Sequence, residues 1–210
     1  QQSSISTSDV SYNFIFNSES NTVTINLYNA FDDLLLGKKI SYNFNGETKE
    51  VVSGVEFVLP IKGLKVDTYT LSYQFKGDEN YTKSSMSTSI TIGPQQSSMG
   101  TSDVSYSFVY GYDVGSVVVN LFDVEGVVVP GVVVNCTLWL GNKEITDMPV
   151  VRSGEAFSIP KGLAGGEYTL MYDFGGNENY TKSSMSTSIT INSQQSSIST
   201  SDVSYNFIFN

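Results

Sequence analysis

The feature that most constrains this chain is an internal repeat. Residues 194–210 repeat residues 1–17 without a mismatch, and a third, near-identical copy begins at Gln95. The copies start 94 and 99 residues apart (95 − 1 and 194 − 95), which divides the chain into two segments of ordinary domain size. We therefore predict two tandem domains, residues 1–93 and 94–193, followed in residues 194–210 by the first strand of a further copy.

Composition argues against several classes of partner and of chemistry. The formal net charge of −10 disfavours nucleic-acid binding, which needs a basic face, and a polybasic membrane contact. There is no histidine, which removes the commonest general base and transition-metal ligand. The single cysteine, Cys136, cannot form an intramolecular disulfide, and no apolar run is long enough to cross a bilayer. We expect no cofactor, no nucleic-acid partner and no membrane insertion.

Apolar side chains recur at every second position through both domains, the pattern of half-buried β-strands. We expect the first strand at Val10–Phe16 and the longest alternation at Tyr69–Phe75, with Asn45-Gly46 as a strong hairpin turn. The second domain repeats these elements, and its extra residues fall around Gly141–Arg152. No stretch has a convincing helical period, so the predicted fold class is all-β.

About seven short strands in roughly 95 residues are what an immunoglobulin-like (Ig-like) sandwich requires. Residues 63–92 and 162–191 share the pattern G-L-x-x-x-x-Y-T-L-x-Y, then G-x-x-N-Y, then a Ser/Thr-rich last strand. This C-terminal third of each domain resembles the ends of Ig-like domain repeats in bacterial and archaeal adhesin-like surface proteins. The resemblance implies two tandem Ig-like β-sandwiches with tyrosine corners at Tyr69 and Tyr168, an extracellular structural or adhesive role, and no catalytic residues.

Identity between the two domains is concentrated in particular segments. Residues 80–92 equal residues 179–191, and residues 8–12 equal residues 102–106, whereas the intervening positions mostly differ. Two interpretations are open. Recent duplication leaves identical patches anywhere, or a shared constraint preserves the last strand, the connector and the next first strand, which together form the junction between domains.

Reactive or metal-binding groups have weak support in the sequence. No histidine is available to activate a serine, so we expect no enzyme activity. The acid pairs Asp32-Asp33 and Asp78-Glu79 are more typical of solvated turns than of a calcium loop. The first strands contain no lysine, and Lys83 and Lys182 precede the last strands, so an internal lysine crosslink is disfavoured.

Three sequons and one tryptophan are the candidate site residues. The sequons begin at Asn80, Asn135 and Asn179, and all three side chains are expected to be exposed. Alternation with Cys136, Leu138 and Leu140 directs Trp139 outward, where it would contact a sugar or a neighbouring domain. The other interpretation is a slipped register near the hairpin, with Trp139 capping the core.

The function that the sequence favours is structural. We predict a repeat segment of a prokaryotic extracellular fibre, stalk or adhesin-like surface protein, assembled head to tail with further copies of the same repeat. The alternative is an adhesin module that binds carbohydrate or a host protein. The last strand, with Val203, Tyr205, Phe207 and Phe209 on one face, would join copies by donor-strand exchange. Otherwise each first strand pairs within its own unit.

Overall fold

Short strands with alternating buried and exposed side chains account for all the regular structure described. The computed structural model describes residues 1–111, 116–145 and 148–199, and within these ranges every element is a β-strand. The chain separates into two compact units, Gln1–Ser97 with Gly175–Lys182, and Ser98–Phe174 with Ser183–Asn210. The predicted domain boundaries after residues 93 and 193 stay predictions.

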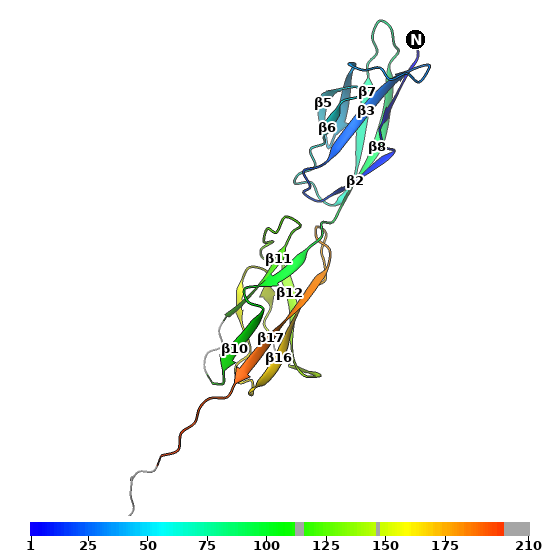
Figure 1. Cartoon of the computed structure of the whole chain (residues 1–210). Helices are drawn as coiled ribbons and strands as arrows, with labels where there is room; N and C mark the ends of the chain where they lie inside the picture. Colours follow the sequence, from blue (N-terminus) through cyan, green and yellow to red (C-terminus); the bar gives the residue numbers. More distant parts are fainter. Residues whose placement is uncertain (112–115, 146–147, 200–210) are drawn as a thin grey trace, which may run out of the picture. The chain divides into compact units, whose positions relative to one another are not determined.

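The first sandwich consists of two sheets (Figure 1). One sheet has the order β1-β3-β6, with β1 at Ser3–Thr7, β3 at Thr22–Asn29 and β6 at Glu56–Val58. The other has the order β2-β8-β7-β4-β5, with β2 at Ser11–Ile15, β8 at Ser84–Gly93, β7 at Asp67–Phe75, β4 at Lys39–Phe44 and β5 at Glu47–Val52. All neighbours are antiparallel except β2 and β8, which run parallel.

The second sandwich repeats this plan. Its smaller sheet has the order β15-β11-β9, with β15 at Ala156–Ser158, β11 at Ser116–Phe122 and β9 at Ser98–Thr101. Its larger sheet has the order β10-β17-β16-β12-β13, with β10 at Ser105–Val109, β17 at Ser183–Asn192, β16 at Gly166–Phe174, β12 at Val133–Leu140 and β13 at Lys143–Ile145. A short β14, Val151–Arg152, also pairs with β12. The prediction of an all-β chain with Ig-like sandwiches is confirmed.

The Asn45-Gly46 hairpin is also confirmed. Both turn residues have positive φ, 48° and 83°, and Phe44 pairs directly with Glu47 across the turn. Positive φ at both central positions is the requirement of a type I′ turn, whose twist matches that of the flanking strands.

The strand predicted at Val10–Phe16 is present as β2, but the sequence did not predict the strand before it, β1. β1 pairs with β3 in the smaller sheet and buries Ile5, whereas β2 pairs with β8 in the larger sheet. Val10, expected to point inward, lies where the chain crosses between the sheets and is 96% exposed. Val104 occupies the same place in the second sandwich and is 92% exposed. The alternation of buried and exposed side chains starts again once the chain has crossed to the other sheet. The pattern of β2 therefore cannot be continued through Val10 into β1.

Hydroxyl groups hold this crossing together. Thr7 Oγ1 donates to Asp9 O at 2.6 Å, Ser8 Oγ and Tyr12 Oη share a hydrogen bond of 2.8 Å, and Asp9 N–H donates to Tyr12 Oη at 3.4 Å. The second sandwich repeats all three bonds through Thr101, Ser102, Asp103 and Tyr106. The identical sequence Ser-Asp-Val-Ser-Tyr therefore has a structural role inside each sandwich, apart from any role at a junction.

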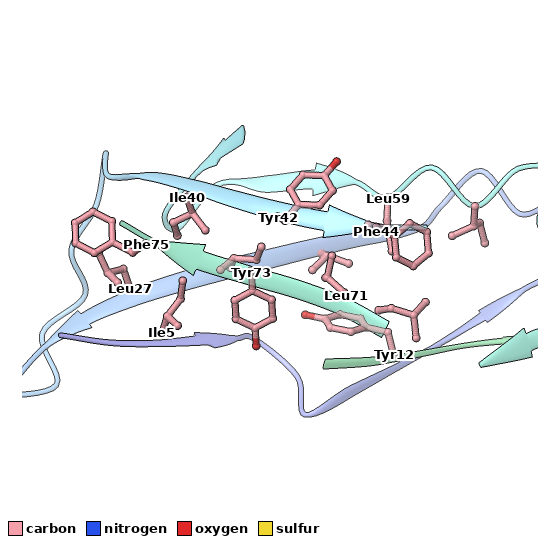
Figure 2. Close-up of a cluster of buried hydrophobic side chains, with 14 of the residues drawn as sticks. Ile5, Tyr12, Leu27, Ile40, Tyr42, Phe44, Leu59, Leu71, Tyr73 and Phe75 are labelled. Carbon is pink, nitrogen blue, oxygen red and sulfur yellow. The ribbon is translucent and has the colours of Figure 1, made fainter. Parts of the chain in front are cut away.

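The core of the first sandwich lies between its two sheets, and Figure 2 shows side chains such as Leu71, Phe44 and Leu59 directed into that space. Its fully or nearly fully buried residues are Ile5, Tyr12, Val23, Ile25, Leu27, Ile40, Tyr42, Phe44, Leu59, Ile61, Leu71, Tyr73, Phe75, Ile90 and Ile92. A hydroxyl network joins the sheets through this core, because Thr88 Oγ1 is 2.8 Å from Thr7 Oγ1 and 2.9 Å from Tyr73 Oη. Such satisfied buried groups fix the relative position of the sheets.

A buried serine that sequence reasoning missed also links the sheets. Ser53 Oγ accepts a hydrogen bond of 2.9 Å from Leu27 N–H, and Ser153 Oγ accepts one of 2.8 Å from Leu121 N–H. Neither serine is exposed to solvent. The pattern Ser-Gly-x-x-Phe, present in both domains, was the signal that could have located them.

Both predicted tyrosine corners have the expected geometry. Tyr69 Oη donates to Lys65 O at 3.0 Å, and Tyr168 Oη donates to Ala164 O at 2.9 Å, each four residues upstream. Tyr168 is 3% exposed, whereas Tyr69 is half-buried.

We expect Tyr168→Phe to lower the free energy of unfolding of the second sandwich by about 1 kcal/mol, because it leaves Ala164 O without its donor. Tyr69→Phe should cost the first sandwich less, since water reaches that bond more easily. Urea denaturation of the two single variants measures both losses. A larger loss for Tyr69→Phe would contradict this assignment.

Candidate functional site

The second sandwich has a distinct outer face on its larger sheet. Asn135, Thr137 and Trp139 occupy alternate positions of β12 and point away from the core, because Val134 and Leu138 on the opposite face of the strand are buried. The structure therefore brings two of the predicted site residues, Asn135 and Trp139, to one face of one strand. The predicted register is kept as far as Leu138, whereas Leu140, expected to point inward, is 38% exposed at the strand end.

Trp139 is half-buried and hydrogen-bonded. Its Nε1 donates to Thr137 Oγ1 at 3.1 Å, which holds the indole along the strand. Of the two interpretations of Trp139, the outward one fits, since Trp139 shares its face with Thr137 and not with Leu138. A ligand contact at Trp139 stays a prediction.

Cross-strand pairing surrounds this strip with residues that the sequence could not place beside it. Asp173 of β16 lies opposite Asn135, Met171 opposite Thr137, and Glu144 of β13 opposite Trp139. Met171 is 47% exposed. These neighbours depend on strand register, for which a single sequence carries no signal.

The corresponding face of the first sandwich has a different character. It contains a shallow hollow of about 670 Å³ lined by Ser41, Tyr42, Asn43, Thr48, Ser72, Tyr73, Gln74, Ser85, Met86 and Ser87. The exposed lining is mostly neutral hydroxyl and amide groups, which offer hydrogen-bond donors and acceptors. Ser41 and Asn43 occupy the positions of Asn135 and Thr137, as their pairing with Gln74 and Ser72 shows.

The two other sequons lie at equivalent turns. Asp78 Oδ1 accepts hydrogen bonds of 2.9 Å from the N–H groups of Asn80 and Tyr81, and Asn177 Oδ1 accepts two of the same length from Asn179 and Tyr180. Asn80 is exposed and Asn179 is half-buried. The occupancy of all three sequons stays a prediction.

In the first sandwich, Asp78 and Asp33 from the two acid pairs already have hydrogen-bond partners. Lys38 Nζ lies 2.6 Å from Asp78 Oδ2, and this hydrogen bond, together with those from the backbone, holds the pKa of Asp78 below its usual value. Asp33 Oδ2 accepts from Asn29 Nδ2 at 3.0 Å. Within residues 1–111, 116–145 and 148–199, no three His, Cys, Asp or Glu side chains form a group able to hold a metal ion.

The remaining reactive side chains are poorly placed for chemistry. Burial raises the pKa of the Cys136 thiol to about 12, so it stays protonated and weakly nucleophilic at neutral pH. Lys83 and Lys182 are exposed to solvent.

The described part of the chain contains no helix of sufficient length and apolar character to traverse a membrane.

Comparison with known proteins gives distant structural likenesses only. No protein-family model and no curated protein matches the sequence. Among solved structures, the fibronectin(III)-like modules of Clostridium thermocellum CbhA are 9% identical, with a TM-score of 0.32 over 90% of this chain and 94% of that chain. Drosophila N-cadherin EC1-4 is 10% identical, with a TM-score of 0.37 over 91% of this chain and 50% of that chain.

A Ca²⁺-stabilized adhesin with which an Antarctic bacterium binds ice is 12% identical, with a TM-score of 0.32 over 92% of this chain and 49% of that chain. The assignment of Ig-like sandwiches therefore rests on the strand order and pairing of this chain itself.

Proposed function

We propose that this chain is a non-enzymatic structural repeat segment of an extracellular fibre, stalk or adhesin-like surface protein. The supporting observation is where the chain enters and leaves a sandwich. The Gln1 amino group donates to Asn80 O at 2.9 Å, in the turn just before β8. β8 then runs ten residues to Gly93, about 33 Å away at the usual rise of a strand. Entry and exit at opposite ends is the arrangement that lets sandwiches follow one another in series.

The end at which the chain leaves the first sandwich is held in place by the end of β2. Gly93 O accepts a hydrogen bond of 2.8 Å from Phe16 N–H, so the end of β8 lies beside the end of β2. The entry contact recurs further along the chain, because Gln95 N–H donates to Asn179 O at 2.8 Å. Copies built this way need no additional surface to follow one another in series, which supports a spacer role.

We further propose that residues 194–210 complete another sandwich by forming the pairs that residues 1–17 form here. β1 and β2 both lie at sheet edges, so an identical segment can replace them without threading through the fold. In both described sandwiches, β2 and β10 pair within their own units, with β8 and β17. By analogy, a further copy of the repeat would be the partner of residues 194–210. The face containing Val203, Tyr205, Phe207 and Phe209 lies outside the described residues.

Removal of residues 1–17 tests this assembly. Without them, the edges of β3 and β8 are unpaired, and residues 194–210 of a second copy are the matching replacement. We expect the shortened chain to form head-to-tail oligomers, whereas the full chain and a chain lacking residues 194–210 stay monomeric. Size-exclusion chromatography with light scattering measures the difference.

The matched control is the shortened chain with Tyr205→Asp. Tyr205 corresponds to Tyr12, which is 8% exposed in the first sandwich, so a charge there should prevent docking. Oligomers that survive Tyr205→Asp, or a shortened chain that stays monomeric and loses its first sandwich, would contradict the assembly.

A second candidate function is a ligand-binding adhesin module for carbohydrate or a host protein. Trp139 beside the exposed Met171 is the feature that favours it. The dissimilar outer faces of the two sandwiches favour the spacer role instead.

A further inference from the structure

A sequon and the only tryptophan of the chain lie on the same face of the same strand. Asn135-Cys136-Thr137 is the sequon, and Trp139 follows two positions later on β12. Asn135 is exposed, and no hydrogen bond involves its side-chain amide in the part of the chain that the structure describes. Its nitrogen is therefore accessible to modification.

The indole is held back toward Asn135. Because Trp139 Nε1 donates to Thr137 Oγ1, which lies between the two residues, the ring extends along β12 in the direction of Asn135. The Cα atoms of Asn135 and Trp139 are about 13 Å apart at the rise of a β-strand. Met171 lies opposite Thr137 and is 47% exposed, so it extends the apolar surface beside the ring.

We propose that Asn135 carries an N-linked glycan whose first sugars stack on Trp139. This inference rests on the extracellular location in the proposed function. In the modification, Asn135 Nδ2 forms a bond to the anomeric carbon of a sugar carried as a lipid-linked diphosphate. The bond from that carbon to the diphosphate oxygen breaks, and the amide nitrogen gives up one proton. The apolar face of a pyranose ring then covers the exposed face of the indole.

The strength of such a contact favours an attached sugar over a free one. One stacking contact with an aromatic ring raises an association constant by about tenfold. That is too little to hold a free sugar against the entropy lost on binding. A covalent link to Asn135 avoids most of this entropy loss, because it holds the sugar near the indole at an effective concentration in the millimolar range. At that concentration a single weak contact is enough to order the glycan.

The rest of the chain provides internal controls. Asn80 and Asn179 belong to sequons in turns, whereas the sequon of Asn135 lies within β12. In the first sandwich, Ser41 and Asn43 replace the sequon residues, and the hairpin turn at Asn45 takes the place of Trp139. Only the second sandwich therefore combines the two features within the described residues.

Trp139 is the sole tryptophan, so its fluorescence reports on this site alone. The full chain is produced in a host that N-glycosylates secreted proteins, and mass spectrometry of glycopeptides gives the occupancy of each sequon. We expect a glycan at Asn135 to lower the acrylamide quenching constant of Trp139 by about twofold relative to Asn135→Gln, because it covers the open ring face. Asn80→Gln and Asn179→Gln should leave the constant unchanged.

Three results would overturn the proposal. The first is equal quenching in the Asn135-glycosylated chain and in Asn135→Gln. The second is an unmodified Asn135 in a chain that is glycosylated at Asn80 or Asn179. The third is protection of Trp139 in Asn135→Gln by the released glycan at millimolar concentration, which would make the site a receptor for free sugar. None of these results bears on oligomer formation by the chain lacking residues 1–17, so the two proposals fail separately.

Discussion

Leu71→Ala is expected to lower the free energy of unfolding of the first sandwich by about 3–5 kcal/mol. Leu71 lies on β7 between β4 and β8, has no exposed surface, and faces the core opposite Phe44. Truncation removes the buried methyl groups and leaves a cavity that rigid sheets on both sides cannot fill. Ser72→Ala, on the outer face of the same strand, should change the free energy by less than about 0.5 kcal/mol.

The single tryptophan separates the two sandwiches in this experiment. Trp139 fluorescence follows the second sandwich, whereas far-ultraviolet circular dichroism follows both. In urea, Leu71→Ala should shift only the dichroism transition of the first sandwich, and the equivalent Leu170→Ala should shift the fluorescence transition. An equal shift of the fluorescence transition by Leu71→Ala would contradict the assignment of two separate cores.

Gly77→Ala is expected to cost about 2–4 kcal/mol, because it combines two penalties. Gly77 has a φ of +89°, which side chains rarely adopt, and a Cβ there would lie 3.1 Å from Lys83 N and 3.2 Å from Tyr81 O. Both contacts are backbone atoms of a turn closed by the hydrogen bond from Asp78 N–H to Tyr81 O, 3.0 Å long, so neither can move aside easily. Gly176, in the turn between β16 and β17, repeats this geometry with a φ of +88°.

Gly46→Ala is the matched control for backbone strain alone. Its φ of +83° is similar, but no atom lies within 4 Å of the added Cβ. The expected loss is about 1 kcal/mol, the cost of the left-handed conformation without a clash. Equal losses for Gly77→Ala and Gly46→Ala in urea denaturation would show that crowding at Gly77 has no effect.

Crowding at Gly77 and Gly176 also bears on the two interpretations of the repeated sequence. Residues 80–92 and 179–191 are identical, and they begin in turns where each glycine is packed against backbone. Together with the hydroxyl bonds at Ser8–Tyr12 and Ser102–Tyr106, this gives the identical segments a structural role within each sandwich. This role inside the sandwich stands beside the two interpretations of the repeated segments, duplication and a constraint on the junction.

Local signals in the sequence determined much of this protein. The period-two alternation of Tyr69–Phe75 predicted β7, and Asn45-Gly46 predicted the hairpin between β4 and β5. Strand pleat and turn geometry depend on neighbouring residues alone. The repeat predicted that the second sandwich would copy the first. Outward placement of Asn135 was predicted from the alternation with its neighbours Val134 and Cys136.

Only the tertiary structure decided what depends on contacts between distant segments. The move of the chain from one sheet to the other at Val10 broke an alternation that looked continuous, and it made a buried strand residue of Ile5 in a polar segment. Strand register placed Met171 and Asp173 beside Thr137 and Asn135, and a hydrogen bond turned Trp139 back along β12. The sequence specifies which face a side chain occupies, but the pairing of strands far apart in the chain specifies its neighbours, and those neighbours make the site.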